Sequence, residues 1–330
     1  MLYDKMNFSL WCDFVERNFI DSEFVELLEK KVINGATSNP AIFKASFLGS
    51  DAYKSDRDAL RGKDAKDVYE TLAIKDISLA SEKMATLHED KRDGFISIEV
   101  DPFLCDDAKA TLEEGRRLYA QIGKSNVMIK VPATDAGYEA MEELMSEGIN
   151  VNATLIFSPK QAKSVVEAFK RATIRFKENF ENKRVPEGVV SVFVSRFDSK
   201  LDVKLSEFGL PEAKVGIMNA IKIYDLIEEF GLENVRTLFA STGVKREDLD
   251  KDYYIKELLF KNSINTAPLE TIKHFLTCKD IEEKVLNKEY EKFFYELENA
   301  GVEMDLVYNE LMDEGLKSFK DAFKQILAQL

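Results

Sequence analysis

The chain has 330 residues, of which 45% are hydrophobic and 32% charged, so it can bury a large core and does not have the composition of a disordered protein. Its formal net charge of −14 argues against nucleic-acid and membrane-surface binding, because both usually require a basic face. Three widely spaced cysteines argue against a disulfide framework and a zinc ribbon, and they fit a reducing, cytoplasmic setting.

Targeting and membrane segments are not expected. The opening stretch MLYDKMNFSLW has no continuous apolar run of the kind found in signal peptides. Nowhere does an apolar run approach the roughly 18 residues that a membrane-spanning helix needs.

Short apolar runs typical of buried strands recur along the chain. Each is only a few residues long, and polar residues follow most of them. In chain order the runs are 9–14, 32–40, 95–102, 127–134, 149–158, 189–197 and 235–242, with a last and ambiguous candidate at 257–268.

Helix-length amphipathic segments separate these runs. Ser22 with glutamates after it is typical of a capped helix start, and Ser158 with Pro159 is typical of an N-cap followed by proline in the first turn. Alternating strands and helices predict a parallel sheet covered on both faces. About eight strands, without a GxGxxG or Walker loop, favour a TIM-type (β/α)8 barrel over an open nucleotide-binding sheet. The helical segments are 22–30, 65–88, 104–122, 135–147, 158–176 and 211–230.

We expect residues 1–330 to form a single domain, because no internal repeat and no Pro- or Ser-rich linker divides them. Extra helices are predicted near both ends of the chain. The acidic tail 279–330 carries an apolar stripe that favours a helix packed on the outside of the barrel over one that binds a partner. The stripe consists of Phe319, Phe323, Ile326 or Leu327, and Leu330.

Lys130 lies inside the apolar strand 127–134, between Ile129 and Val131. A charged ammonium there is costly unless it is paired. A neutral lysine amine can attack a carbonyl to form a Schiff base. The same position also suits a strand-end lysine that reaches solvent along its flexible stem, and the strand alone leaves both interpretations open.

Carboxylates occupy the neighbouring strand candidate. Ser97, Glu99 and Asp101 share one face of 95–102, because side chains alternate along a strand. A carboxylate on that face can pair with Lys130 or act as an acid or base, and a purely structural ion pair is the alternative.

More polar side chains lie at the ends of successive strand candidates, where the active sites of barrels are found. Asn152 and Thr154 share one strand face, as do Ser191 and Phe193 on another. Together these ends supply an amine, carboxylates, neutral groups for hydroxyls and an arginine for a phosphate. The remaining members of the cluster are Asp13, Asn39 and Arg196.

Other chemistries have weaker support. The two histidines, His88 and His274, lie in charged and helical surroundings, so a histidine triad or a metal site is not expected. Cys12 fits a small buried hydrophobic residue better than a nucleophile, and Trp11 is expected in the core.

Six segments of the chain carry a recognisable pattern. They are INGATSNPAIFKASF (33–47), SIEVDP (97–102), MIKVPATDAGYEAMEEL (128–144), NVNATLIFSPKQA (150–162), SVFVSRFDSKLD (191–202) and LFASTGVK (238–245). In this order they resemble the transaldolase family.

The likeness runs from Asp13 to about Pro268 and implies a β/α barrel without a cofactor. It also implies a transferase of the pentose phosphate pathway that moves a dihydroxyacetone unit from sedoheptulose 7-phosphate to glyceraldehyde 3-phosphate. The sequence does not decide between a monomer and a homodimer.

The resemblance also implies roles for individual residues. Lys130 would form an imine with the ketose, and Asp13 would take the proton from the C4 hydroxyl during cleavage and return it on transfer. Glu99 and Thr154, with a water, would shuttle protons during imine formation. The substrate-binding residues would be Asn39, Asn152 and Ser191 for the hydroxyls, Phe193 beside the intermediate, and Arg196 and Ser241 for the phosphate.

Two positions distinguish this chain within that resemblance. Many transaldolases have an arginine where this sequence has Gly243, and Lys245 is the nearest cation, which would bind phosphate as a point charge rather than as a fork. The related fructose-6-phosphate aldolases are described as having a tyrosine at the position of Phe193, and we expect a tyrosine there to raise release of free dihydroxyacetone.

Two other functions remain open at this stage. One is a lyase such as a fructose-6-phosphate aldolase, against which the length of the chain and Phe193 argue. The other is a sugar-phosphate-binding barrel without catalysis, because a fold does not by itself prove a function.

Overall fold

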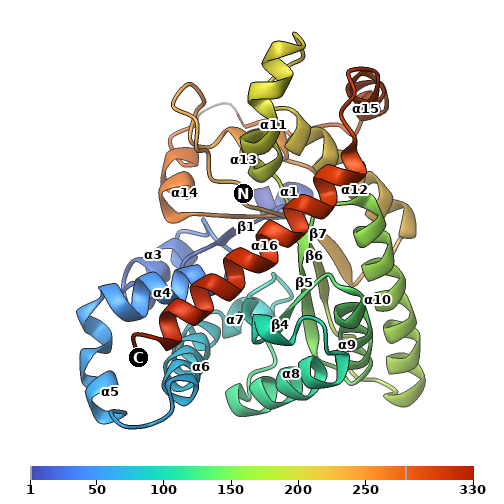
Figure 1. Ribbon diagram of the computed structural model, residues 1–330. Helices are drawn as coiled ribbons and strands as arrows, with labels where there is room; N and C mark the ends of the chain where they lie inside the picture. Colours follow the sequence, from blue (N-terminus) through green and yellow to red (C-terminus); the bar gives the residue numbers. More distant parts are fainter. Residues whose placement is uncertain (1, 279–280) are drawn as a thin grey trace.

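A computed structural model describes residues 2–278 and 281–330 as a barrel of parallel strands surrounded by helices (Figure 1). The strands follow one another in chain order, and β8 pairs with β1 to close the barrel. The predicted (β/α)8 class is therefore confirmed. The strands are β1 Ser9–Cys12, β2 Gly35–Thr37, β3 Ile96–Glu99, β4 Val127–Pro132, β5 Asn150–Ile156, β6 Gly188–Phe193, β7 Val235–Ala240 and β8 Ile264–Ala267.

Each predicted strand segment contains one strand, with two corrections at the ends. In the ambiguous segment 257–268 only the last part is a strand. The expectation that Arg196 ends a strand is wrong, because β6 stops at Phe193 and Arg196 lies in the first turn of the next helix. The apolar spacing changes there from two residues to four, and the buried residues Phe197, Leu201 and Leu205 form a helical stripe.

Helices follow the strands and cover the barrel wall. The N-cap predicted at Ser158 is confirmed, since its hydroxyl accepts from the Gln161 amide at 3.1 Å, and the Gln161 side chain completes a capping box. Ser22 occupies the N-cap position of α3 as predicted, but its side chain does not cap the helix, because the hydroxyl donates to the Asn18 carbonyl instead. The helices are α1 Leu2–Met6, α2 Arg17–Ile20, α3 Glu23–Glu29, α4 Pro40–Gly49, η1 Asp51–Tyr53, α5 Lys54–Ala59, α6 Ala65–Lys83, α7 Ala85–Glu89, η2 Pro102–Leu104, α8 Ala108–Ile122, α9 Asp135–Ser146, α10 Pro159–Asn179, α11 Ser195–Glu207, α12 Val215–Phe230, α13 Tyr253–Glu257, α14 Leu269–Phe275, α15 Glu289–Asn299 and α16 Met304–Leu327.

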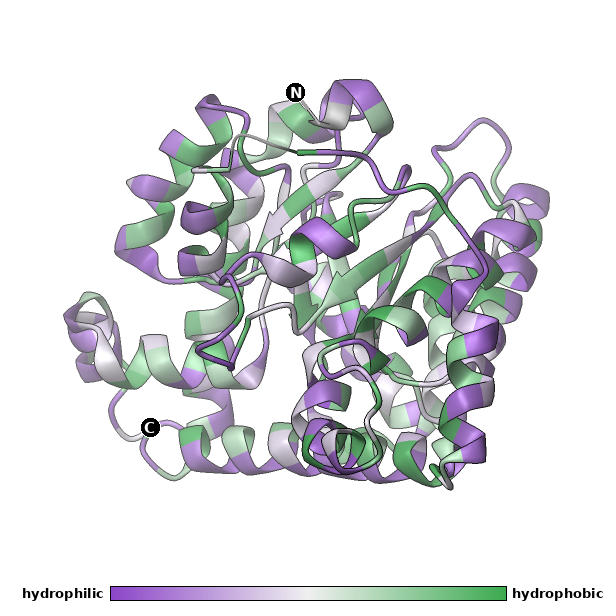
Figure 2. Ribbon diagram, turned by 90° about the horizontal axis from the view of Figure 1, so that it is seen from above, coloured by the Kyte–Doolittle hydropathy of each residue, from purple (hydrophilic) through white to green (hydrophobic). Residues whose placement is uncertain are grey.

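The core lies between the strands and the inner faces of these helices. Figure 2 shows hydrophilic residues mainly on the outer turns and hydrophobic residues mainly toward the barrel. Trp11 and Cys12 on β1 are fully buried, as predicted from the sequence. Among the described residues, no helix has both the length and the apolar content that a bilayer crossing requires.

The C-terminal helix α16 has a different place from the one that its apolar stripe predicts. It runs diagonally across the barrel and contacts α4, β5 and η2, rather than packing only on the outer wall (Figure 1). Phe319, Phe323 and Ile326 are the buried members of its stripe. Residues 279 and 280, which begin the predicted tail, lie outside the described residues.

Candidate active site

Lys130 is the centre of the polar cluster. The strand register aligns Lys130 with Glu99 on one neighbouring strand and with Asn152 on the other, so the three residues form one row. Its side chain is buried, and Nζ donates to the Ser38 carbonyl at 3.1 Å. Of the two interpretations left open by the sequence, the structure favours the buried amine over a stem that reaches solvent.

Glu99 lies beside this amine. Its Oε2 is 3.8 Å from Lys130 Nζ, which is an ion pair but too long for a good hydrogen bond. Among the described residues, neither carboxylate oxygen of Glu99 has a hydrogen-bond partner. Burial raises the pKa of Glu99 to about 7, with Lys130 opposing the rise and Asp13 adding to it. A carboxyl group with such a pKa can both give and take a proton near neutral pH.

Asp13 follows β1 and faces the same amine. Burial raises the pKa of this carboxyl, while the charge of Lys130 and a hydrogen bond from Thr37 lower it. The Thr37 hydroxyl donates to Asp13 at 2.6 Å and lies 2.6 Å from the Thr266 hydroxyl. Asp13 is therefore oriented by its neighbours and electrostatically linked to both Lys130 and Glu99.

A chain of neutral groups continues the site onto the next strands. Ser191 Oγ donates to Asn152 Oδ1 at 2.6 Å, and Asn152 Nδ2 donates to Ser97 Oγ at 2.9 Å. Thr154 is fully buried, and among the described residues its hydroxyl has no partner. A buried hydroxyl without a partner is expected where a polar ligand or a water binds.

The backbone is irregular next to Thr154. The pairing of β5 with β6 shifts between Ala153 and Ile156, and Leu155 there has a φ of 58°. A leucine in this left-handed region is strained, at a cost of roughly 1–2 kcal/mol. Bulges of this kind commonly re-aim side chains beside active sites, so the strain marks the same strand end as the polar cluster.

A second group lies at the ends of β6 and β7. The hydroxyls of Ser195 and Ser241 are 3.1 Å apart, and Ser241 has a left-handed φ of 55°. The guanidinium of Arg196 stacks on the Phe193 ring at 5.2 Å. Burial lowers the pKa of Arg196, and the charge of Glu314 on α16 opposes that change. A half-buried arginine beside two serine hydroxyls is a suitable group for a phosphate.

The surroundings of Gly243 are crowded. A Cβ at this position would lie 3.1 Å from Pro268 Cγ, so a larger side chain would need Pro268 to shift slightly. Lys245, two residues later, is exposed in the loop after β7.

Asn39 begins α4, where its Oδ1 accepts from the Ile42 amide at 3.0 Å. The side-chain oxygen is thus committed to the helix cap, and the amide NH2 is the part that could bind a hydroxyl.

Several residues around the site have no separate signal in the sequence. Thr37, Ser38 and Thr266 are small polar residues at strand ends, where such residues also serve ordinary turns. Phe319 approaches Lys130 from α16, with its ring centre 5.7 Å from Nζ. Its helical stripe is visible in the sequence, but nothing local shows that the stripe reaches a strand far earlier in the chain.

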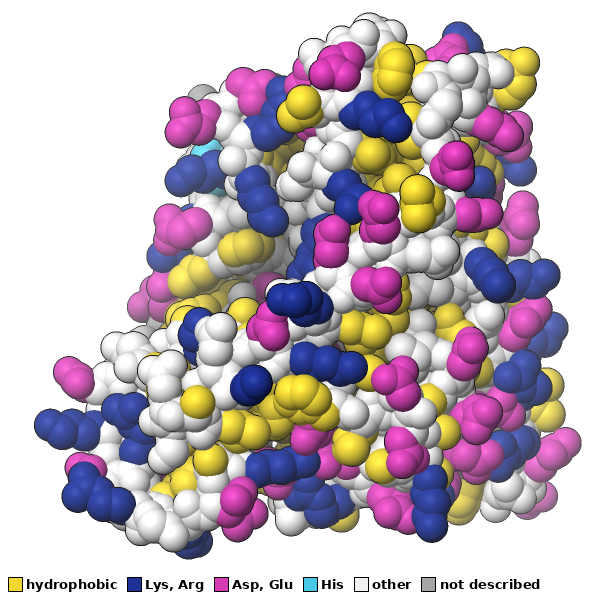
Figure 3. Space-filling model, in the orientation of Figure 1, with side chains coloured by type: hydrophobic (Ala, Val, Ile, Leu, Met, Phe, Trp, Pro, Cys, Tyr) yellow, Lys and Arg dark blue, Asp and Glu magenta, His cyan; other side chains and the backbone are white. Residues whose placement is uncertain are grey.

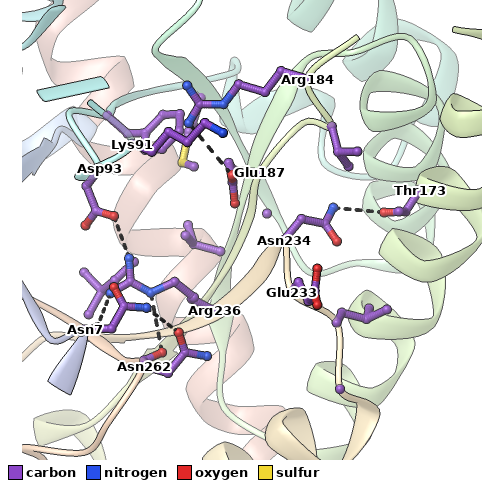
Figure 4. Close-up of a pocket in the computed structure, with 18 of the residues that line it drawn as sticks. Asn7, Lys91, Asp93, Thr173, Arg184, Glu187, Glu233, Asn234, Arg236 and Asn262 are labelled. Atoms are coloured by element: carbon purple, nitrogen blue, oxygen red, sulfur yellow. Dashed lines mark hydrogen bonds and ion pairs between the residues drawn. The ribbon is translucent and has the colours of Figure 1, made fainter. Parts of the chain in front are cut away.

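A separate cavity of about 690 Å3 opens at the other end of the barrel, where the strands begin (Figure 4). Its polar groups largely satisfy one another. Asp93 pairs with Arg236 at 2.6 Å, and Asn234 donates to Thr173 at 3.0 Å. Functional groups of barrels gather at the carboxyl ends of strands, so we regard this end as structural.

The surface at the carboxyl ends is also hollowed. Figure 3 shows a hollow beside α16 with Lys and Arg side chains along it. Among the described residues, no group of three or more His, Cys, Asp and Glu side chains is placed to hold a metal ion. The fold and site define a β/α-barrel protein with a buried lysine near two carboxylates at the carboxyl ends of the strands.

Comparison with known proteins agrees with this class. The family model described as transaldolase/fructose-6-phosphate aldolase matches residues 10–330. A transaldolase from Campylobacter jejuni subsp. doylei is 49% identical over 98% of this chain and 99% of its own length. A transaldolase from Helicobacter pylori is 45% identical over 97% of this chain and 98% of its own length.

The chain therefore belongs to the transaldolase/fructose-6-phosphate aldolase family. Its relatives over nearly the full length are transaldolases, and the protein is an enzyme of the transaldolase type.

Proposed function

We propose that the enzyme transfers a dihydroxyacetone unit from sedoheptulose 7-phosphate to glyceraldehyde 3-phosphate through a Schiff base on Lys130. The products are erythrose 4-phosphate and fructose 6-phosphate, as in the non-oxidative pentose phosphate pathway. The observation that supports this most strongly is the buried Lys130 amine, 3.8 Å from Glu99 and electrostatically coupled to Asp13.

The first half of the cycle attaches the donor. The Lys130 amine attacks the C2 carbonyl to give a carbinolamine, which loses water to become a protonated imine. Glu99 donates the proton that leaves with the water, and the unpartnered hydroxyl of Thr154 is a suitable holder for that water. The pKa of Glu99, about 7, suits a group that gives and later takes this proton.

Carbon–carbon cleavage follows. Asp13 accepts the proton of the C4 hydroxyl, the C3–C4 bond breaks, and its electron pair moves into the imine to give an enamine. The aldose leaves, the acceptor aldehyde enters, and the enamine carbon attacks it while Asp13 returns the proton. Water then hydrolyses the new imine and restores the Lys130 amine.

Binding groups would hold the three-carbon unit during the exchange. Asn152 and Ser191 already form a hydrogen-bonded chain that hydroxyls of the substrate could join. Arg196 and Ser241 would bind the phosphate, and Lys245 would add charge from the loop. Asn39 would offer its amide NH2. The remaining carbons of the intermediate would lie against Phe193.

Acceptor dependence tests transfer against simple cleavage. We expect fructose 6-phosphate to be consumed only when erythrose 4-phosphate is present as the acceptor. The variant Phe193→Tyr adds a hydroxyl beside the intermediate and should raise release of free dihydroxyacetone. Consumption of fructose 6-phosphate by the parent enzyme without any acceptor, with stoichiometric dihydroxyacetone, would instead establish a lyase.

A further inference from the structure

Helix α16 places an aromatic ring directly over the candidate nucleophile. The Phe319 ring centre is 5.7 Å from Lys130 Nζ, and both side chains are buried. The ring comes from the part of the chain farthest in sequence from β4, and it occupies the space beside the buried amine. Water therefore cannot reach the amine through the place that Phe319 occupies.

Phe323, one turn further along α16, lies near the neighbouring carboxylate, since both residues line one small cavity. It is buried, and its ring packs edge-on against Tyr69 at 4.9 Å. Phe323, Tyr69 and Glu99 line a small internal cavity of about 10 Å3. This is about the room that one water molecule needs, and Glu70, Asp101 and Glu114, which also line the cavity, make it polar enough to hold one.

Close packing and ion pairs fix the position of α16 over the site. At Gly315 a Cβ would lie 2.9 Å from Leu155 Cδ2 and 3.6 Å from Arg196 Nη1, so only glycine allows the helix to come this close without a shift. Lys200 on α11 pairs with Glu310 and Glu314 of α16 at 2.8 Å each. These contacts keep Phe319 and Phe323 in place over Lys130 and Glu99.

We propose that Phe319 and Phe323 form an apolar cover that keeps bulk water from the covalent intermediate and so favours transfer over hydrolysis. The inference rests on the proposed Schiff-base function. One water beside Glu99 suffices for the cycle, because imine formation releases one water and the final hydrolysis consumes one. The cover admits that single water while it excludes the solvent.

The competing reaction has a simple balance. The enamine carbon takes a proton, which turns the enamine back into a protonated imine of dihydroxyacetone. Water then adds to the imine carbon, and the carbon–nitrogen bond breaks with loss of a proton. The sum is enamine plus water giving dihydroxyacetone and the free Lys130 amine. The first step needs a proton delivered to the enamine carbon, and both steps would be faster if solvent could enter at the place that Phe319 occupies.

The test compares how the parent enzyme and its variants partition the intermediate. Each protein receives fructose 6-phosphate and erythrose 4-phosphate, and free dihydroxyacetone is measured against sedoheptulose 7-phosphate. The variants are Phe319→Ala, Phe323→Ala and the apolar replacement Phe319→Leu. The control is Tyr308→Ala, an aromatic of the same helix that packs against Phe197 and bonds to Asn219 away from Lys130.

We expect Phe319→Ala to raise the ratio of release to transfer on the order of tenfold, a change of barrier that a lost water-excluding contact can account for. Phe319→Leu should raise it less, and Tyr308→Ala should leave the ratio unchanged even if it lowers stability. An unchanged ratio in folded Phe319→Ala and Phe323→Ala, with the lysine adduct still trapped by borohydride, would overturn the cover. Absence of the adduct in the parent enzyme would instead overturn the Schiff-base function, and the cover with it.

Discussion

The carboxyl groups at the carboxyl end of the barrel have pKa values that differ from those of the same groups in water. Burial raises the pKa values of both Asp13 and Glu99, and the nearby Lys130 charge only partly offsets this effect. The carboxyl groups of Asp13 and Glu99 also interact with each other, because the charge of Asp13 adds to the rise in the pKa of Glu99. Such shifted groups are concentrated at functional sites, where they adjust proton transfer to neutral pH.

The raised pKa of Glu99 should make the free energy of unfolding fall as the pH rises. Its pKa rises from an ordinary 4.5 to about 7 on folding, so the folded protein retains a proton that the unfolded chain has released between these values. Stability from this group is complete below about pH 4.5 and is lost as the pH rises through 7. The variant Glu99→Gln cannot ionise and should therefore gain stability relative to the parent as the pH rises.

Urea unfolding at several pH values measures this gain. Between about pH 5 and pH 8 we expect the advantage of Glu99→Gln to grow by on the order of 1–3 kcal/mol. An exposed carboxylate on α10, changed in Glu178→Gln, serves as the control and should show no such growth. A difference between Glu99→Gln and the parent that stays constant with pH would contradict the buried, proton-retaining carboxyl.

At the scale of elements, the apolar runs of the sequence predict where the strands lie, but they locate the ends of the strands less accurately. Apolar runs located all eight barrel strands, because parallel strands buried on both faces have few polar residues. The sequence predicts Arg196 at a strand end, but it lies in α11, because the change from strand to helix occurs inside one apolar-rich stretch. Alternation of side chains predicts which residues of one strand share a face, but the row of Glu99, Lys130 and Asn152 also depends on the register between strands, which only the structure shows.

The part of the site contributed by α16 could not be predicted from pattern. The stripe with Phe319 and Phe323 shows that one helix face is buried, but amphipathicity does not identify the surface that buries it. The contact with Lys130 joins positions far apart in the chain, and only the closed fold brings them together. For the same reason, the sequence does not predict that Thr37 and Thr266 meet beside Asp13.

The close approach of α16 gives a prediction for that element. A leucine at Gly315 would overlap Leu155 and crowd Arg196, so Gly315→Leu should lift the helix. Overpacking of this kind costs about 1–3 kcal/mol, and the displaced Arg196 should raise KM for the phosphorylated donor. Thermal unfolding and steady-state kinetics measure the two effects.

The matched control for this variant is Asp313→Leu, which adds the same side chain to an exposed position of α16. It should leave KM unchanged. Equal stability and equal KM for Gly315→Leu and the parent would contradict the close packing of α16 against the barrel at Gly315.

For the molecule as a whole, we propose that the barrel and its C-terminal helices form one domain. The tight contacts of α16 with β5 and α4 support this proposal. Trp11, the single tryptophan, is buried in β1 and reports on the barrel, whereas far-UV circular dichroism reports mainly on the helices. In one cooperative unit both signals should change at the same temperature. Loss of helical signal well before the Trp11 fluorescence changes would show that the tail unfolds separately.

Covalent trapping tests the central claim most directly. The protein is incubated with fructose 6-phosphate and reduced with borohydride, and the modified peptide is mapped by mass spectrometry, with Lys130→Ala as the control. We predict a reduced three-carbon adduct on Lys130 that is absent from the control. A folded protein that binds fructose 6-phosphate yet yields no adduct on Lys130 would contradict the Schiff-base mechanism.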